Sequence, residues 1–142
     1  MSKLPLSARV AELLLKPNPA VVASIRPNGT PHTAATWYEW RGGRVLLNMD
    51  SGRRRLAYMR SNPSVSVNVM DVDDMYRSVS LSGTIAEFVD DDGFRDIDAL
   101  CRRYLGCPYP DRTTSRVSAW LAVDSWFLWD SVRETTGLDE VM

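Results

Sequence analysis

Residues 48–63 read Asn-Met-Asp-Ser-Gly-Arg-Arg-Arg-Leu-Ala-Tyr-Met-Arg-Ser-Asn-Pro. The apolar run 45–49 predicts a strand, and 56–61 predicts a helix that ends at Asn62-Pro63. Three consecutive arginines, 53–55, therefore lie on a strand-to-helix turn. A helix N-terminus carries unpaired N–H donors and partial positive charge, so cations there are unfavourable unless an anion binds among them. The turn predicts a phosphate or carboxylate site, and the alternative is a solvated basic turn.

Alternating apolar and polar residues on both sides of this turn predict a β-rich chain. Strands are expected at 20–25, 30–40, 44–49, 64–69, 76–89, 117–124 and 126–130, with Asn28-Gly29 as a hairpin turn. Short helices are expected after Ser7, at 56–61, and from Phe94 to Leu105, the last capped by Asp90, Asp91 and Asp92 and stopped by Gly106. Six or seven strands with short helices predict a mainly β fold, a closed antiparallel barrel with helices over its ends.

Composition indicates one soluble domain. The chain has 142 residues, 44% of them hydrophobic and 25% charged, so we expect a single domain over 1–142 with a loose tail at 131–142. No run approaches the roughly 20 apolar residues that span a bilayer, and the N-terminus lacks a signal-peptide core, so we expect a cytoplasmic protein without membrane contact. The net charge of −1 disfavours nucleic acid as a partner.

The cysteines and the single histidine do not indicate a metal or redox centre. Cys101 and Cys107 lack a metal-binding or redox spacing, and we expect both to be buried, reduced thiols. His32 is the only histidine, which excludes a three-histidine zinc site. It also leaves any Ser-His-Asp mechanism without a recognisable nucleophile motif.

The order of several short motifs resembles a known family. The motifs are the hairpin Arg26–His32, then Asn48–Ser51, Arg54-Arg55, Arg60–Pro63 and the strand start Val65–Val67. Together they resemble the split β-barrel flavin and deazaflavin oxidoreductases, the pyridoxamine 5'-phosphate oxidase-like proteins, over residues 6 to 130. The single short domain looks most like the actinobacterial branch that uses the deazaflavin coenzyme F420, and flavin mononucleotide (FMN) is the rival cofactor.

This resemblance implies an FMN-binding-like split barrel that forms a homodimer, with the cofactor in a groove between two barrels. In that family the basic turn holds the cofactor phosphate, usually through Arg-Lys where this chain has Arg54 and Arg55. Relatives often carry Asn where this chain has Tyr58. The implied activity is hydride transfer between reduced deazaflavin and a planar, conjugated small-molecule acceptor.

Candidate site residues follow from the turn and from the resemblance. Neighbours on one strand point to opposite faces, so one of Trp37 and Tyr38 must leave the core, and we place both at the cofactor groove. A proton is expected from His32, Tyr38 or solvent. The acidic tail of F420 could be bound by Arg53, Arg112 or Arg116. The cofactor-binding candidates are Arg53, Arg54, Arg55, Ser51, Asn48, Thr33, Thr36 and Trp37, of which Thr33, Thr36 and Asn48 are equally compatible with ordinary strand positions.

Three alternatives remain open from the sequence. The first is an FMN-dependent oxidoreductase of the same fold, and the second is a carrier that binds F420 or flavin without turnover. The third is an oligonucleotide-binding barrel, which the net charge and the acidic turns disfavour. Trp120 and Trp126 are equally compatible with the interior and with a subunit interface.

Overall fold

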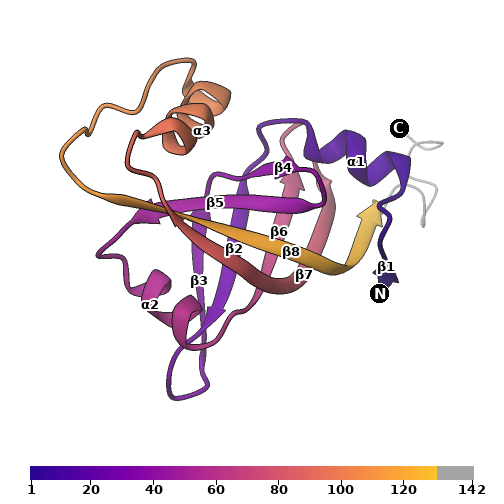
Figure 1. Ribbon diagram of the computed structural model, residues 1–142. Helices are drawn as coiled ribbons and strands as arrows, with labels where there is room; N and C mark the ends of the chain where they lie inside the picture. The colour runs from indigo at the N-terminus through magenta and orange to yellow at the C-terminus, as the bar shows by residue number, and fades with distance from the viewer. Residues whose placement is uncertain (131–142) are drawn as a thin grey trace.

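The computed structural model describes residues 1–130, which form one antiparallel sheet with three helices (Figure 1). The strands run in the order β3-β2-β6-β7-β8-β5-β4, and β1 pairs with β8. The predicted tail at 131–142 lies outside the described residues. The elements are β1 (Ser2–Lys3), α1 (Ala8–Leu14), β2 (Ala20–Ile25), β3 (Pro31–Thr36), β4 (Glu39–Arg41), β5 (Arg44–Asp50), α2 (Arg54–Ser61), β6 (Ser64–Asp71), β7 (Asp74–Asp90), α3 (Arg95–Leu105) and β8 (Arg116–Asp130).

The mainly β fold class is confirmed, with three local differences. The order of paired strands ends at β3 and β4, and no ladder joins these two within residues 1–130, so the barrel is split and not closed. The single strand predicted over 30–40 is divided into β3 and β4 at Trp37 and Tyr38. The two strands predicted over 117–130 are one strand, β8.

β8 stays continuous because irregularities in its pairing with β7 absorb the bend. The register shifts between Ser82 and Gly83 and again between Ile85 and Glu87. At Gly83 a Cβ atom would lie 1.9 Å from the carbonyl oxygen of Ala122. Only glycine lets the two backbones approach this closely.

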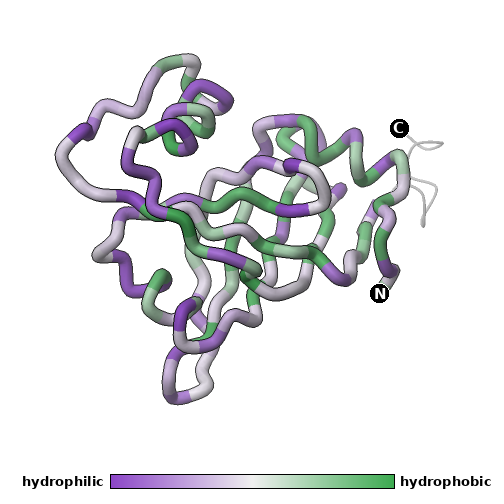
Figure 2. Tube along the Cα trace, viewed as in Figure 1, coloured by the Kyte–Doolittle hydropathy of each residue, from purple (hydrophilic) through white to green (hydrophobic). Residues whose placement is uncertain are grey.

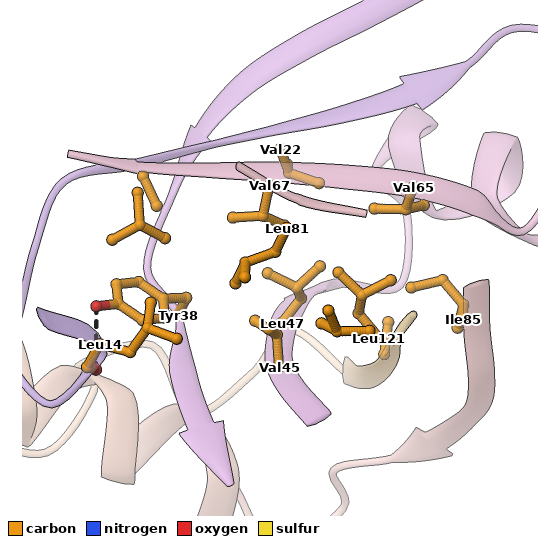
Figure 3. Close-up of a cluster of buried hydrophobic side chains, with 14 of the residues drawn as sticks. Leu14, Val22, Tyr38, Val45, Leu47, Val65, Val67, Leu81, Ile85 and Leu121 are labelled. Carbon is orange, nitrogen blue, oxygen red and sulfur yellow. Dashed lines mark hydrogen bonds between the residues drawn. The ribbon is translucent and has the colours of Figure 1, made fainter. Parts of the chain in front are cut away.

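Side chains from both halves of the sheet fill the barrel. Alternate residues of β2, β5, β6, β7 and β8 point inward, and Val22, Leu47, Val67, Leu81 and Leu121 meet there (Figure 3). This is the period-2 pattern expected of strands with one buried face. In Figure 2, the hydrophobic residues along these strands are green.

α3 covers the outer face of β5 and β8 and forms a second, smaller buried layer. Leu46 points away from the barrel interior, yet it is fully buried, as are Ile97 and Leu100 of α3. Ser118 Oγ of β8 donates to Asp96 Oδ2 of α3 at 2.7 Å. Cys101 is buried as predicted, but Cys107 is exposed because it follows the end of the helix at Gly106.

Both ends of this helix are held by specific contacts. Of the three predicted capping aspartates, Asp91 accepts hydrogen bonds from the backbone N–H groups of Asp96 and Ile97, at 3.1 and 2.9 Å. Near the C-terminus, Arg103 donates to the carbonyl oxygens of Leu14 and Leu15 at 3.0 and 2.9 Å, and it also donates to that of Lys16. Because these carbonyls belong to the last turn of α1 and the residues after it, Arg103 fixes α3 to the N-terminal helix.

Candidate functional site

An open pocket of about 820 Å³ lies between the sheet and α3. Its walls come from segments far apart in the sequence: the end of β3, the turn before α2, the start of β8, α3 and the loop after it. It is lined by Pro17, Pro19, Ala20, Ala34, Ala35, Thr36, Trp37, Asn48, Arg53, Arg55, Val72, Ile97, Leu100, Tyr104, Tyr109 and Arg116.

Three arginines gather at one end of this pocket. Arg53 pairs with Asp50, with 2.9 Å between Nε and Oδ2. Arg55 Nε is buried and has no hydrogen-bond partner among residues 1–130. Burial lowers the pKa of Arg55, the positive charges of Arg53 and Arg116 lower it further, and Asp50 alone raises it. The basic end is therefore short of negative charge and of acceptors, as expected of an anion site.

The helix that follows these arginines adds to the same effect. α2 begins at Arg54, its N-cap residue Arg53 makes no side-chain capping bond, and its first turn contains no acidic residue. A helix start of this kind favours a bound anion over the cations that the chain places there.

Asn48 and Arg116 lie beside the basic turn, since Arg116 is the cross-strand partner of Asp50. Arg116 Nε donates to Asn48 Oδ1 at 2.8 Å, and its guanidinium lies over the ring of Tyr109, 4.7 Å from the centroid. Asn48 Nδ2 donates to Asp91 Oδ2 at 3.1 Å and to Ser118 Oγ at 3.0 Å. A buried network therefore holds this side of the pocket in place.

Aromatic rings form a side wall of the pocket. Trp37 stacks on Tyr104 with centroids 5.5 Å apart and 13° between the planes, and it meets Tyr109 edge-on at 6.4 Å. Tyr104 OH donates to the carbonyl oxygen of Asn18 at 2.6 Å. Burial raises the pKa of Tyr104 to about 12, so its hydroxyl stays neutral near pH 7. The wall offers flat apolar surface against which a conjugated ring system can pack.

Five of the predicted cofactor contacts line this pocket. They are Thr36, Trp37, Asn48, Arg53 and Arg55. The other three, Ser51, Arg54 and Thr33, have exposed side chains and are not among the lining residues. Ser51 Oγ instead lies 2.5 Å from Ser115 Oγ.

The two proton-donor candidates lie outside the pocket lining. His32 packs edge-on against Tyr58, with centroids 5.5 Å apart, and its Nδ1 is buried without a partner among residues 1–130. Tyr38 is 0% exposed and belongs to the barrel core, so its placement at the groove is corrected. Of the adjacent pair, Trp37 lines the pocket. The hydroxyl of Tyr38 is hydrogen-bonded to carbonyl oxygens at the end of α1 and just after it.

Sequence reasoning missed the part of the pocket that α3 and its loop provide. The apolar stripe containing Tyr104 predicts core packing, and nothing local marks Tyr109 as a pocket residue. Arg112, a candidate for the F420 tail, is instead paired with Asp98 at 2.6 and 3.1 Å and holds the loop to α3. Arg116, the other loop candidate, does line the pocket.

Comparison with known proteins identifies the family. The family model for pyridoxamine 5'-phosphate oxidase matches residues 6–130. The chain belongs to the pyridoxamine 5'-phosphate oxidase family. This family of split barrels includes flavin- and F420-dependent oxidoreductases, in agreement with the resemblance in the sequence motifs.

Solved structures agree with this family. An F420 reductase is 25% identical with a TM-score of 0.77, covering 87% of this chain and 98% of its own. A conserved hypothetical protein of Mycobacterium tuberculosis is 23% identical with a TM-score of 0.70, covering 94% and 90%. A putative pyridoxamine 5'-phosphate oxidase of Listeria innocua is 14% identical with a TM-score of 0.68, covering 87% and 97%. The last two show the fold alone. No curated protein matches the sequence.

Residues 1–130 contain neither a membrane-spanning helix nor a cluster of metal-binding side chains. None of the helices there is long and apolar enough to cross a membrane. No group of three His, Cys, Asp or Glu side chains in this part of the chain could hold a metal ion.

Proposed function

We propose that this protein is an oxidoreductase that binds coenzyme F420, or alternatively FMN, in the pocket between the sheet and α3. The observation that carries the proposal is the buried, unpartnered Nε of Arg55 beside Arg53 and Arg116, at one end of a pocket with an aromatic side wall. A phosphate-bearing flavin or deazaflavin has a group for each part of this pocket: an anionic phosphate for the arginines and a flat conjugated ring for the aromatic wall. The F420 reductase among the similar structures supports the deazaflavin.

The pocket residues divide the work of binding. Arg53 and Arg55 bind the phosphate through charge-assisted hydrogen bonds, which suit a planar guanidinium. Trp37, stacked on Tyr104, gives the ring system a rigid surface and excludes water from one side. Ser51, Arg54 and Thr33 stay predicted contacts.

A bound flavin or deazaflavin supplies the hydride chemistry, and this chain supplies position and environment. The hydroxyl proton of Tyr104 is donated to the carbonyl oxygen of Asn18 at 2.6 Å, and burial raises the pKa of this hydroxyl to about 12, so it is a poor acid. Tyr38 is enclosed in the core, and His32 lies outside the pocket lining. Solvent is therefore the proposed source of any proton, and the acceptor is proposed to be a planar conjugated molecule that fits the open side of the pocket.

We also propose that the protein is a homodimer with the pocket near its interface, as the resemblance implies. Cross-strand pairing places Val21, Asn68, Ser80 and Phe127 in one row on the outer face of the sheet. Val21 and Phe127 are 42% and 53% exposed. The neighbouring row adds Trp129, which pairs with Ser78. A face of small residues with large apolar side chains is suited to another protein surface.

The test is fluorescence titration of the protein with F420 and, separately, with FMN. We expect saturable binding of one or both, with the tighter ligand naming the cofactor. The double variant Arg53→Met/Arg55→Met should weaken binding at least about 100-fold, at about 1.5–3 kcal/mol for each charge-assisted contact. Arg60→Met is the matched control, because Arg60 is an exposed arginine near the other end of α2.

Two results would change the conclusion. Wild-type protein that binds neither cofactor overturns the cofactor assignment. Tight binding without oxidation of the reduced cofactor by quinone or nitroaromatic acceptors favours the carrier alternative.

A further inference from the structure

Arg116 lines the pocket beside the basic turn, as the cross-strand partner of Asp50, and its geometry is fixed. Nε is used by Asn48 Oδ1 at 2.8 Å, and the guanidinium plane is supported by the ring of Tyr109. Its two terminal nitrogens have no hydrogen bond or ion pair within residues 1–130, although Arg116 lines the pocket. A held arginine with free terminal donors is suited to an oxyanion.

Asn48 has little freedom to do anything except hold Arg116. Its side chain is buried, and both hydrogens of the amide have acceptors, Asp91 Oδ2 and Ser118 Oγ. These bonds point the amide oxygen toward Arg116. The acceptors are themselves fixed, because Asp91 caps α3 and Ser118 donates to Asp96.

The balance of charge at this end of the pocket indicates what binds there. Three guanidinium groups, those of Arg53, Arg55 and Arg116, line it, and Asp50 is the carboxylate that pairs with one of them. Among these four side chains the excess is two positive charges, and the nearby carboxylate of Asp91 is already engaged by Asn48 and by two backbone N–H groups of α3. A ligand group with a single negative charge would leave one guanidinium uncompensated in a partly buried site, which is costly.

We propose that Arg116 is the third arm of the anion site and binds, from the start of β8, a ligand group that carries two negative charges, with Asn48 as its positioning residue. This inference rests on the proposed function and names the chemistry of its ligand. Two sources have this chemistry: the phosphate monoester of FMN, and the phosphodiester of F420 together with a carboxylate of its acidic tail.

The experiment is the equivalent of a double-mutant cycle. The phosphate is removed from the ligand, the guanidinium is removed from the protein, and the two changes are made separately and together. FMN and riboflavin are titrated into wild type and Arg116→Met, and F420 is compared in the same way with its deazaflavin lacking the phosphate and tail. We expect Arg116→Met to weaken FMN or F420 about 10- to 100-fold and to change the phosphate-free ligand less than about 2-fold. Arg60→Met should leave all four affinities unchanged.

Variants of the neighbouring residues test the positioning role. Arg116→Lys keeps the charge but loses the planar fork, and we expect it to recover only part of the affinity. Asn48→Ala should weaken FMN or F420 by less than Arg116→Met does and leave the phosphate-free ligand unchanged. In the double variant Asn48→Ala/Arg116→Met, the loss should equal that of Arg116→Met alone, because Asn48 acts through Arg116.

A second measurement separates failure of this inference from failure of the proposed function. Inorganic pyrophosphate should raise the midpoint of thermal unfolding of wild type and not that of Arg116→Met. Pyrophosphate binding through Arg116 in a protein that binds no flavin or deazaflavin would keep the anion site and overturn the cofactor assignment. Equal losses for ligands with and without phosphate, or no loss for either, would overturn the role of Arg116.

Discussion

Tyr38 connects several parts of the fold through one hydroxyl group. Its Oη donates toward the carbonyl oxygens of Leu14 and Lys16, at 3.1 and 2.9 Å, and accepts from Asn18 Nδ2 at 3.2 Å. The Leu14 contact is drawn in Figure 3. Burial raises the pKa of this hydroxyl. At the scale of the residue, Tyr38 is therefore a structural group that stays protonated.

Tyr38→Phe tests this assignment. The change removes one donor from two carbonyl oxygens that keep Arg103 as a donor, so we expect the free energy of unfolding in urea to fall by about 0.5–1.5 kcal/mol. The affinity for FMN and F420 should stay within about 2-fold of wild type. If turnover fell and its pH profile changed while stability did not, Tyr38 would be a proton donor after all.

The arginines show how much the sequence predicts at this scale. Three cations on a strand-to-helix turn are enough to predict an anion site. Which of them faces the pocket depends on the direction that each takes at the helix start, and Arg54 is exposed where Arg55 is half-buried. The contribution of Arg116 depends on pairing between β5 and β8, where Asn48 lies opposite Ser118. No local pattern in the sequence contains that information.

At the scale of the element, β7 and β8 determine the shape of the barrel. They are 17 and 15 residues long and bend together where the register shifts. Alternation predicts both strands, because each has one buried face. It predicts a break in β8 at Ser125 that does not exist, because β8 continues there with one extra residue, Asp124, opposite the step from Ser82 to Gly83 of β7.

Gly83→Ala tests the close approach of the two strands. The new methyl group would meet the backbone at Ala122 at 1.9 Å, and backbone cannot move aside as a flexible side chain can. We expect a loss of about 3 kcal/mol in the free energy of unfolding. Gly93→Ala is the matched control, because a Cβ there meets nothing within 4 Å, and its effect should stay within about 0.5 kcal/mol. Equal effects of the two substitutions would contradict the role of Gly83.

The sequence also did not predict that residues 30–40 divide into two strands, β3 and β4. The run has the composition of one long strand. The break lies at Trp37 and Tyr38, where Trp37 stacks on Tyr104 of α3 and Tyr38 enters the core. The contact with α3 comes from a segment more than 50 residues later in the chain. For the same reason the aromatic wall of the pocket could not be predicted from the sequence.

At the scale of the whole molecule, the proposed dimer is tested through its apolar face. We expect wild type to sediment at twice the monomer mass. Phe127→Ser/Trp129→Ser should shift the protein to monomer at the same concentration, because the substitutions remove two of the largest apolar groups from the face. Leu15→Ser is the control, since Leu15 is 70% exposed and lies on another element. A wild type that is monomeric up to high concentration would rule the dimer out.

The hydrogen bonds from Arg103 to the carbonyl groups of residues 14–16 matter when the protein is shortened from its N-terminus. The helix that carries Arg103 also carries Tyr104 and Ile97 of the pocket. Trimming the N-terminus beyond residue 16 would take away the carbonyl groups that anchor the far end of α3. The same cut removes Val10, Leu13 and Leu14 from the barrel core, so failure of a shortened protein to bind would be no evidence against the pocket.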